Sequence, residues 1–539
     1  MCNFAPSCGI KEYTMKWKKS PIGVQDFKSL IEDGYLYIDK TDIIYELIHD
    51  GRNAFLSRPR RFGKSLLCST LRYYFQGEKE LFKGLKIYDL EKDWTKHPVL
   101  HFGLSTGDYS SLEYIKSSLS CCLYQYEEIY GKESSEESLS SRFAGIIKRA
   151  HEQTGQKVVV LIDEYDKPLL ETLDNKELNE QTRKVLKSFY GTMKFSDEHI
   201  RFIFLTGVTK FSKVSVFSDL NNLYDISMED DYAAICGITE DELLNVLDEE
   251  IVELSEKYKV NKAEMIEKLK RKYDGYHFTP AMLDIYNPFS LLSAFKAKRI
   301  GDYWFATGTP TFLTRLIKET DYCVRDLCGV EATAGSLGDI STPEQNPVPI
   351  LYQSGYLSLK EYIEEFDSYI LDFPNSEVKN GFLNYLLPEY SPDARNENLF
   401  GVAQFVRDVR NNNIDSFLTR LKSLVAKIPY TQIPEEERDN LLEQQYQNVT
   451  FIIFTLMGYY VVVEQHFSEG RIDLVVKTAT HIYVMEFKVG EGTADAALEQ
   501  INEKHYAAPY LAEEKQIVKI GIGWNQATRN IDDWKIEAQ

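Results

Sequence analysis

The chain has 539 residues and a mass of 62.3 kDa, so it is too long for one hydrophobic core and we expect about two to four domains. Its hydrophobic fraction of 43% is that of a folded globular protein. The formal net charge of -21 argues against a general polyanion binder, because non-specific affinity for nucleic acid comes from neutralised phosphates. A local basic groove remains compatible with this charge.

The cysteines and the apolar segments indicate the cellular compartment of the protein. The eight cysteines are scattered without a CxxC pair, as is typical of reduced thiols in a cytosolic protein. No secretory segment follows Met1. The most apolar stretch, "VTFIIFTLMGYYVVV", is too short to cross a bilayer and is interrupted by Gly458. We therefore expect a cytoplasmic protein that does not contact a membrane.

A strand, a loop and a helix are predicted between residues 53 and 75. "NAFLS" (53–57) is a short apolar strand, and "KSLLCSTLRYYF" (64–75) carries apolar residues at helical spacing. The loop between them lies within "SRPRRFGKSLL" (57–67). A loop between a strand and a helix is where phosphate-binding loops lie, because the backbone N–H groups and the helix N-terminus face the anion there.

The loop matches only part of the phosphate-binding pattern G-x-x-x-x-G-K-[ST]. Gly63, Lys64 and Ser65 follow the pattern, but Arg58 occupies the position of the first glycine and would be strained there if that position needs a positive φ. A basic turn is the alternative interpretation, and the flanking strand and helix favour the nucleotide site. The loop residues predicted to bind nucleotide are Pro59, Arg60, Arg61, Phe62, Gly63, Lys64, Ser65 and Leu66.

Two further apolar strands are predicted to end at the same site. "KVVVLIDEYD" (157–166) is an apolar run typical of a parallel strand buried on both faces, and ligands bind at the carboxyl ends of such strands. Asp163 is expected to hold Mg²⁺ together with Ser65, and Glu164 to polarise the attacking water. "IRFIFLTGVTK" (200–210) ends in polar residues, of which Thr206 is favoured as a sensor of the γ-phosphate.

The last hundred residues carry a second group of charged residues. "GRIDLVVKT" and "HIYVMEFKV" alternate as the strands of a hairpin joined by "TAT". Glu486 and Lys488 lie two residues apart and share a face, and Asp473 falls on the neighbouring strand. Two carboxylates and an ammonium at one sheet suit metal-dependent phosphodiester cleavage, with Asp473 and Glu486 holding Mg²⁺ and Lys488 positioning water. An exposed hairpin that carries these residues by chance is the alternative, but charges within so apolar a strand are costly.

With these motifs, the chain resembles a predicted AAA-ATPase-like family of bacterial proteins that pair an ATPase with a C-terminal PD-(D/E)XK nuclease-like domain. The resemblance covers nearly the whole chain from Pro21. It is carried by "PIGVQDF", "YIDKT", "SRPRRFGKSLL", "VLIDEYDKP", "FLTGVTKFSKVSVFSDLNNL", "YNPFSLL", "YWFATGTPTFL" and "GRIDLVVKTATHIYVMEFK". It further implies that Glu443, on a predicted helix, and Gln500, on a later helix with Tyr506, belong to the nuclease-like site.

The resemblance implies an α/β fold class. A P-loop NTPase core of the AAA/STAND-like type would be followed by a helical lid, a winged-helix-like region and a C-terminal α/β restriction-endonuclease-like domain. The expected division is a tail at 1–20, the P-loop ATPase core at 21–235, the lid at 236–345, the winged-helix-like region at 346–390, a helical linker at 391–435 and the nuclease-like domain at 436–539.

Two functions remain open from the sequence. The first is an ATP- and Mg²⁺-dependent nuclease acting on nucleic acid, with DNA favoured; defence against foreign DNA or mobile-element biology would fit, and the chain could act as a homo-oligomer. ATP is preferred because no N-K-x-D motif follows the third strand to select guanine. The second is an ATP-driven switch or partner-binding protein with a catalytically silent nuclease fold, which the acidic net charge favours.

Overall fold

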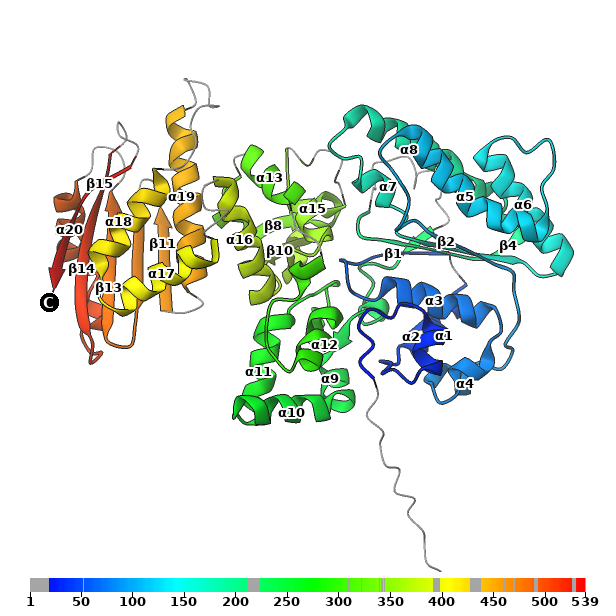
Figure 1. The fold of residues 1–539 in the computed structure, drawn as a ribbon, viewed down its shortest axis with the longest axis horizontal. Coiled ribbons are helices and arrows are strands. Elements are labelled where there is room, and N and C mark those ends of the chain that lie inside the picture. The colour runs from blue at the N-terminus through cyan, green and yellow to red at the C-terminus, as the bar shows by residue number, and fades with distance from the viewer. Residues whose placement is uncertain are drawn as a thin grey trace, which may run out of the picture.

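A computed structural model describes residues 19–51, 53–210, 223–307, 311–320, 322–338, 340, 343, 345–390, 398–426, 438–458, 462–468, 471–488, 493–525 and 530–538. Figure 1 shows successive groups of elements arranged along the long axis, from the N-terminal sheet and its helices to the C-terminal sheet at the other end. All but the last two residues of the expected tail, 1–20, lie outside the described residues. Within the described residues, no helix combines the length and the apolar character needed to cross a bilayer.

The N-terminal group is built on a five-stranded parallel sheet with the order β2-β3-β4-β1-β5. Its strands are β1 (Asn53–Ser57), β2 (Val99–Gly103), β3 (Val158–Asp163), β4 (Ile200–Gly207) and β5 (Leu223–Asp225). All six residues of β3 are buried, as expected for a parallel strand covered on both faces. The predicted strands at the phosphate loop and at the acidic turn are thus confirmed.

Helices cover both faces of this sheet. They are α1 (Phe27–Glu32), α2 (Thr41–His49), α3 (Lys64–Phe75), α4 (Lys86–Leu90), α5 (Leu112–Tyr130), α6 (Leu139–Thr154), α7 (Lys167–Leu170) and α8 (Lys176–Phe195). Figure 1 shows α1 to α4 on one face and α5, α6 and α8 on the other. Because β4 lies between β1 and β3, the carboxyl ends of these three strands meet at one edge of the sheet, beside the start of α3.

A helical group follows and has a hydrophobic core of its own. Its elements are β6 (Ile238–Thr239), α9 (Glu240–Val246), α10 (Asp248–Tyr258), α11 (Lys262–Tyr273), β7 (Ile285–Tyr286) and α12 (Pro288–Ala297). Thr239 and Glu242 form a capping box that starts α9. The Lys40 ammonium, from the segment before α2, donates to the Glu242 carboxylate at 2.5 Å and joins this group to the N-terminal group.

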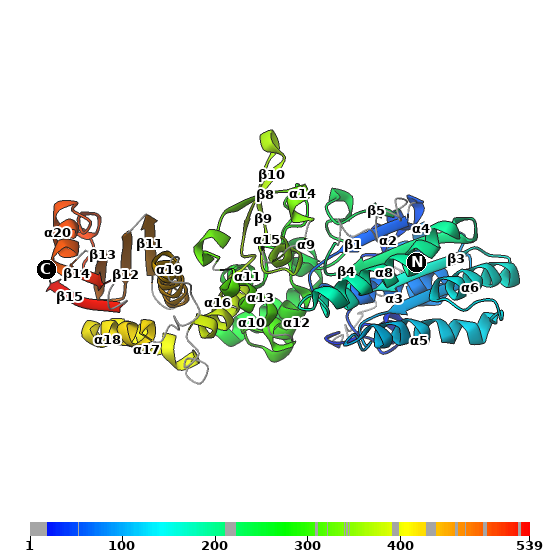
Figure 2. The same ribbon diagram turned by 90° about the horizontal axis from the view of Figure 1, so that it is seen from above.

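The next group has a three-stranded sheet with the order β8-β10-β9. Its elements are α13 (Thr311–Glu319), β8 (Val330–Thr333), α14 (Ala334–Leu337), α15 (Val348–Gln353), β9 (Ser358–Ile363), β10 (Ser368–Asp372) and α16 (Ser376–Tyr390). The antiparallel pair β9 and β10 forms a hairpin that projects from the molecule (Figure 2). Because β8 pairs with β10, the expected boundary at residue 345 falls inside this group rather than before it.

The C-terminal group is a mixed five-stranded sheet with the order β11-β12-β13-β14-β15, in which only β13 and β14 are parallel. Its elements are α17 (Asn398–Arg410), α18 (Ile414–Val425), α19 (Arg438–Met457), β11 (Val462–Ser468), β12 (Arg471–Lys477), β13 (His481–Lys488), α20 (Ala494–Glu503), β14 (Gln516–Asn525) and β15 (Asn530–Ala538). The predicted hairpin joined by "TAT" is confirmed as β12 and β13.

The helices α17 and α18 contact the C-terminal sheet. They fall within the region expected as a helical linker, but they pack on the C-terminal sheet. The Tyr483 hydroxyl of β13 donates to the Val409 carbonyl at 2.9 Å, and the Trp534 indole N–H of β15 donates to the Asp415 carboxylate at 2.9 Å. The buried apolar side chains of α18 give the physical reason, since they need a partner surface.

Candidate functional site

The phosphate loop between β1 and α3 contains two residues in the left-handed backbone region. Arg61 has a φ of 71° and Gly63 a φ of 93°, and Gly63 is the residue that precedes the first turn of α3. Arg58 is not among the residues with positive φ. The position that holds glycine in the general pattern therefore does not need one here, and the expected strain at Arg58 does not arise.

Arg58 instead has a structural role behind the loop. Its side chain is 2% exposed and donates to the carbonyl oxygens of Ser57 (2.9 Å), Ser227 (2.8 Å) and Tyr232 (3.3 Å). Its guanidinium also lies 4.3 Å from the centre of the Phe278 ring. These contacts fix the start of the loop against the segment that follows β5.

Lys64 is the buried cation of the loop. Its ammonium donates to the carbonyl oxygens of Arg58 (2.9 Å) and Pro59 (3.0 Å), and only 7% of the residue is exposed. Burial lowers the pKa of Lys64, and the negative charges of Asp163 and Asp166 oppose that effect. Lys64 is thus a cation at the start of α3, where the partial positive charge of the helix also favours an anion.

A cavity of about 790 Å³ lies in front of the loop. Seven predicted nucleotide-binding residues line it together with Glu164: Arg60, Arg61, Phe62, Gly63, Lys64, Ser65 and Leu66. The ring of Phe62 is also part of the hydrophobic core. The volume falls in the range of small-molecule and cofactor pockets. The loop, the first turn of α3 and the acidic turn after β3 therefore share one cavity.

The remaining walls of the cavity come from residues that our sequence reasoning did not select. The segment before α1 contributes Ile22 and Val24, the segment before α2 contributes Ile38 and Lys40, and the helical group contributes Phe289. Two of these segments lie in "PIGVQDF" and "YIDKT", which we noted only as marks of the family. Their scattered apolar side chains have no pattern that would identify a pocket wall before the chain is folded.

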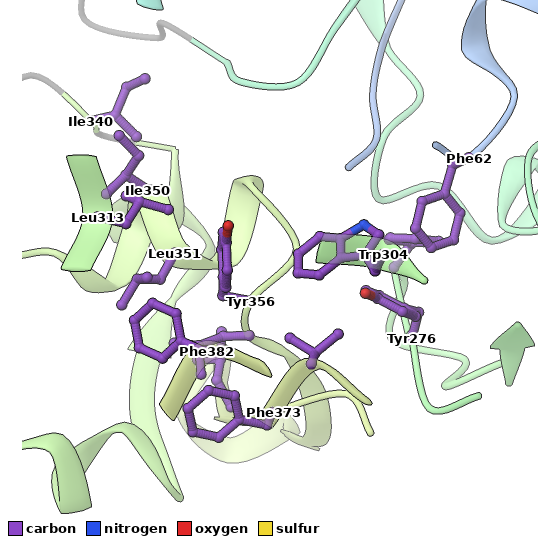
Figure 3. Close-up of a cluster of buried hydrophobic side chains, with 14 of the residues drawn as sticks. Phe62, Tyr276, Trp304, Leu313, Ile340, Ile350, Leu351, Tyr356, Phe373 and Phe382 are labelled. Carbon is purple, nitrogen blue, oxygen red and sulfur yellow. The ribbon is translucent and has the colours of Figure 1, made fainter. Parts of the chain in front are cut away.

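The group that contains α15 and β9 closes the cavity from a further side. Ser354 and Tyr356 line it together with Trp304 from the segment before α13, and the ring centres of Trp304 and Tyr356 lie 4.9 Å apart. Gly355 has a φ of 85°, and a Cβ at this position would lie 2.6 Å from the Cβ of Pro59. Figure 3 shows Tyr356 and Trp304 between the apolar side chains of this group and Phe62 of the loop. The loop is thus packed directly against a region more than two hundred residues later in the chain.

The acidic turn after β3 brings three carboxylates close to Lys64. Asp163 ends the strand and accepts the N–H of Glu164 at 3.0 Å, and Glu164 has a left-handed φ of 53°. Burial and the neighbouring Asp163 raise the pKa of the Glu164 carboxyl group. Asp166, which we did not select from the sequence, is 1% exposed and also lines the cavity. The signal that could have selected it is the third acid in "DEYD".

Thr206 lies in a position that differs from the expected one. Its side chain is fully buried and its hydroxyl donates to the Leu56 carbonyl of β1 at 2.8 Å. This bond turns the hydroxyl toward the neighbouring strand, and Val208 is the residue at this strand end that lines the cavity. The structure therefore does not bring Thr206 to the place expected for a phosphate sensor, because the strand β4 is central and its side chains pack within the sheet.

Oxygen donors on and near the cavity wall are of the kind that a hard divalent cation prefers. Ser65 lies on the cavity wall, and Asp163, which is not one of the lining residues, ends the buried strand β3. Magnesium is bound through hydroxyl and carboxylate oxygens together with the phosphates of its nucleotide. The donor set at this edge of the sheet is therefore the right kind for Mg²⁺ with a nucleoside triphosphate.

The C-terminal sheet brings the second set of predicted residues together. Asp473 of β12 is the direct Cα partner of Glu486 of β13, and Glu486 is fully buried. The Lys488 ammonium donates to the side-chain oxygen of Gln500 on α20, and the Gln500 amide lies 3.3 Å from the Tyr506 hydroxyl. The predicted association of Lys488, Gln500 and Tyr506 is therefore present.

Glu443 and Asp473 are placed only by their backbone. Glu443 lies on α19 and Asp473 on β12, and the side chains of both lie outside the part of the chain that the structure describes. On β13, Tyr483, Met485 and Phe487 join the large hydrophobic core, whereas Ile482 and Val484 join a separate cluster with residues of α20. The predicted alternation of this strand is thus confirmed, and Glu486 and Lys488 belong to the face that carries α20.

These two regions define the class of protein: an α/β protein with a parallel sheet that carries a phosphate loop, followed by a mixed sheet with an acidic and lysine-bearing hairpin. Residues 21–217 match the family described as "Predicted AAA-ATPase", and residues 441–534 match the "PD-(D/E)XK nuclease superfamily".

The chain is also similar to an "Uncharacterized protein in vnfD 5'region" of Azotobacter chroococcum mcd 1. The two are 36% identical over 537 residues, which is 97% of this chain and 100% of the relative. The chain therefore belongs to the family of predicted AAA-ATPases with a C-terminal PD-(D/E)XK nuclease-superfamily domain, and the resemblance stated from its motifs is confirmed.

Proposed function

We propose that the N-terminal region binds ATP with Mg²⁺ and hydrolyses it. The observation that carries this proposal is one cavity lined by both Lys64, at the start of α3, and Glu164, after β3. Lys64 would bind the β- and γ-phosphates, and Glu164 would accept a proton from the attacking water. Ser65 and Asp163 would hold Mg²⁺, which neutralises charge on the phosphates when bound.

The apolar part of the cavity supports adenine as the base. Ile22, Val24, Ile38 and Phe289 lie on its walls and offer surfaces on which a purine could stack. The guanine-selecting motif N-K-x-D is absent from the sequence after β4. Binding of fluorescent ATP and GTP analogues to the full chain tests this proposal, which fails if GTP binds as tightly as ATP.

We further propose that the C-terminal region cleaves nucleic acid, with DNA favoured, and that ATP turnover gates the cleavage. Two contacts support a metal-dependent phosphodiesterase site. Asp473 is paired with Glu486, and Lys488 contacts Gln500 on the face of β13 that carries α20. Asp473 and Glu486 would hold Mg²⁺, which when bound polarises the phosphate. Lys488 and Gln500 would position the water, and Glu443 would lie at the edge of the site.

The group between the two regions supports a physical link. We infer that α13, β8, α14, α15 and the β9–β10 hairpin form a winged-helix-like unit, because the order of elements and the sheet order β8-β10-β9 suit that fold. Its residues line the nucleotide cavity, and α16 packs on α19 of the C-terminal group. Asn448 of α19 accepts the N–H of Val324 at 2.8 Å and donates to the Tyr390 hydroxyl at 3.1 Å.

The test is a cleavage assay on single- and double-stranded DNA and RNA with Mg²⁺, with and without ATP. The proposal predicts that DNA is cut when both Mg²⁺ and ATP are present, and that EDTA abolishes cutting. Cutting at the same rate without ATP would refute the gating and leave the nuclease proposal standing.

A partner-binding switch with a silent nuclease fold is the second candidate. The tip of the β9–β10 hairpin favours it, because Glu364, Glu365 and Asp367 surround Phe366, whose ring is 64% exposed. Such an acidic tip repels a phosphate backbone and suits a protein partner better than DNA. The absence of cutting under every metal and nucleotide condition, together with ATP-dependent binding of a protein, would establish this alternative.

A further inference from the structure

The turn after β3 and the end of β4 are joined by a buried carboxylate. Asp166 is 1% exposed, and its Oδ2 atom accepts hydrogen bonds from the N–H of Val208 (3.0 Å), the N–H of Thr209 (2.6 Å) and the hydroxyl of Thr209 (2.6 Å). A Cβ at Gly207 would overlap the Asp166 carboxylate. The carboxylate therefore fills the space between two chain segments that lie at the same edge of the cavity.

The neighbouring tyrosine joins the same two segments. The Tyr165 hydroxyl donates to the Thr209 carbonyl at 2.9 Å, and the Tyr165 N–H donates to the Thr206 carbonyl at 3.1 Å. The Tyr190 hydroxyl of α8 donates to the Tyr165 carbonyl at 3.0 Å, and Tyr165 is fully buried. Residues 165–166 are thus fixed to residues 206–209 through backbone and side-chain bonds.

Glu164 precedes this clamp and has an unusual backbone. Its φ of 53° lies in the left-handed region, which a residue with a Cβ occupies only when its surroundings hold it there. Its own N–H is held by Asp163 at 3.0 Å, and the next two residues are held by the clamp. The direction in which Glu164 enters the cavity is therefore set by its neighbours rather than by its own preference.

We propose that Asp166 is a positioning residue for ATP hydrolysis, which acts by fixing the turn that presents Glu164 to the cavity. This inference rests on the proposed ATPase function and names a residue outside the P-loop and the strand-end acids. Asp166 acts through the backbone of residues 208 and 209 rather than on the phosphate. Asp166 acts as a hydrogen-bond acceptor, so the side-chain amide oxygen of an asparagine can replace its carboxylate oxygen.

The burial of Asp166 also supports its role as a hydrogen-bond acceptor that fixes the turn. It raises the pKa of the Asp166 carboxyl group, whereas the bonds from Thr209 and the charge of Lys64 oppose that rise. A buried carboxyl group held by three donors is suited to fixing a structure, because those donors would lose their partner if the group moved.

The test compares Asp166→Asn with Asp166→Leu in steady-state ATP turnover by the full chain. Asp166→Leu removes the acceptor, so kcat should fall at least about tenfold while KM and nucleotide binding stay within about threefold. Asp166→Asn keeps an acceptor oxygen and should retain kcat within about fivefold. Equal losses in the two variants would overturn the proposal, since they would show that the negative charge itself acts on the substrate.

A matched control is Asn179→Leu on α8. Asn179 is 6% exposed and donates to the Leu169 carbonyl (2.8 Å) and the Thr172 hydroxyl (2.9 Å), close to the same turn but outside the clamp. This variant should lose stability and keep kcat per folded molecule. If Asn179→Leu lowers kcat as much as Asp166→Leu, the effect is one of general destabilisation and the positioning role is refuted.

A second readout does not depend on ATP turnover. Backbone hydrogen exchange at Val208 and Thr209 should become at least about tenfold faster in Asp166→Leu and stay close to the parental rate in Asp166→Asn. Unchanged exchange in Asp166→Leu would overturn the clamp. If the parental protein hydrolyses no ATP, the proposed function fails while the exchange result still decides whether Asp166 holds the two segments together.

Discussion

The two sheets of this protein place acidic residues in different ways. In the N-terminal sheet, Asp163 ends a parallel strand and Glu164 follows it, and Lys64 begins the helix after another strand. In the C-terminal sheet, Asp473 and Glu486 lie within adjacent antiparallel strands and are direct partners. The first site therefore depends on turns beyond the strands, whereas the second depends on strand register.

This difference has consequences for how each site is built. The N-terminal cavity needs residues in the left-handed backbone region, such as Gly63 and Glu164, and walls from distant segments. The hairpin needs only the short turn at 478–480: Lys477 pairs with Ile482, and four steps along each strand reach Asp473 and Glu486. The positions of acids at strand ends can therefore be adjusted by loops, whereas the positions of acids within a hairpin are set by its register.

The largest effect is expected at the hairpin. Asp473→Ala and Glu486→Ala should each reduce Mg²⁺-dependent cleavage by at least about a thousandfold, because each removes a proposed metal ligand. The double variant should cost little more than either change alone, since residues that act as a unit are not additive. Lys488→Ala should abolish cleavage with metal still bound.

Gel-based cleavage, metal titration and ATPase assays on the same preparations check this prediction. Glu499→Ala, an exposed acid beside Gln500 on α20, is the matched control and should cut like the parental protein. Nucleotide binding should survive all of these changes. Cleavage that persists in Asp473→Ala would show that the hairpin is not the active site.

The next largest effect is expected at the strand end. Glu164→Gln keeps the shape of the side chain and removes its charge, so ATP should still bind while turnover falls on the order of a hundredfold or more. Because the pKa of Glu164 is raised by burial and by Asp163, turnover should also decline on the acidic side at a pH above that expected for an ordinary glutamate. Phosphate release between pH 5 and pH 8 measures both effects.

Glu177→Gln, an exposed acid in the first turn of α8, serves as the control for Glu164→Gln. It should leave the rate and its pH profile unchanged. Parental rates in Glu164→Gln would mean that Glu164 is a structural acid and that another group accepts the proton.

A third prediction concerns the stability of the helical group, in which Asp274 follows the last residue of α11. Burial, followed by the charge of Asp284, raises the pKa of Asp274 to about 7. The carboxyl group thus binds its proton more tightly in the folded protein than in the unfolded chain. Its contribution to the free energy of unfolding is therefore fully present below the pKa of the unfolded chain, and it is lost as the pH rises through about 7. Asp274→Asn cannot ionise. From pH 5 to pH 8, its free energy of unfolding should therefore rise relative to that of the parental protein by on the order of 2 kcal/mol.

Equilibrium urea unfolding of both proteins at several pH values checks the Asp274 prediction. Asp33→Asn, at the exposed C-terminal end of α1, is a control for a helix-terminal aspartate and should unfold like the parental protein. A constant difference between Asp274→Asn and the parental protein over this pH range would contradict the prediction.

The smallest of these effects is expected at the phosphate loop. Lys64→Ala removes the ammonium that would reach the β- and γ-phosphates, so nucleotide affinity should fall about tenfold or more, which is about 1.4 kcal/mol. Fluorescent-nucleotide titration measures the affinity, with Lys83→Ala, an exposed lysine, as the control. Unchanged binding in a folded Lys64→Ala protein would contradict a nucleotide site at this loop.

Local patterns were sufficient for the elements that carry both sites. The strand at 53–57, the helix at 64–75 and the hairpin joined by "TAT" all agree with the structure, because apolar spacing and turn residues act over a few neighbouring positions. The same patterns placed Asp473 and Glu486 on neighbouring strands, since a short turn leaves little freedom in the register of a hairpin.

Only the tertiary structure decided what surrounds those elements. Apolar spacing cannot show that Ile22 and Tyr356 line one cavity, that β8 pairs across the expected boundary at residue 345, or that α17 and α18 pack on the C-terminal sheet. It also could not show that the Thr206 hydroxyl bonds to β1 or that Asp166 holds the ends of β3 and β4 together. These contacts join residues far apart in the chain, so they depend on how the elements pack and not on the pattern within any one of them.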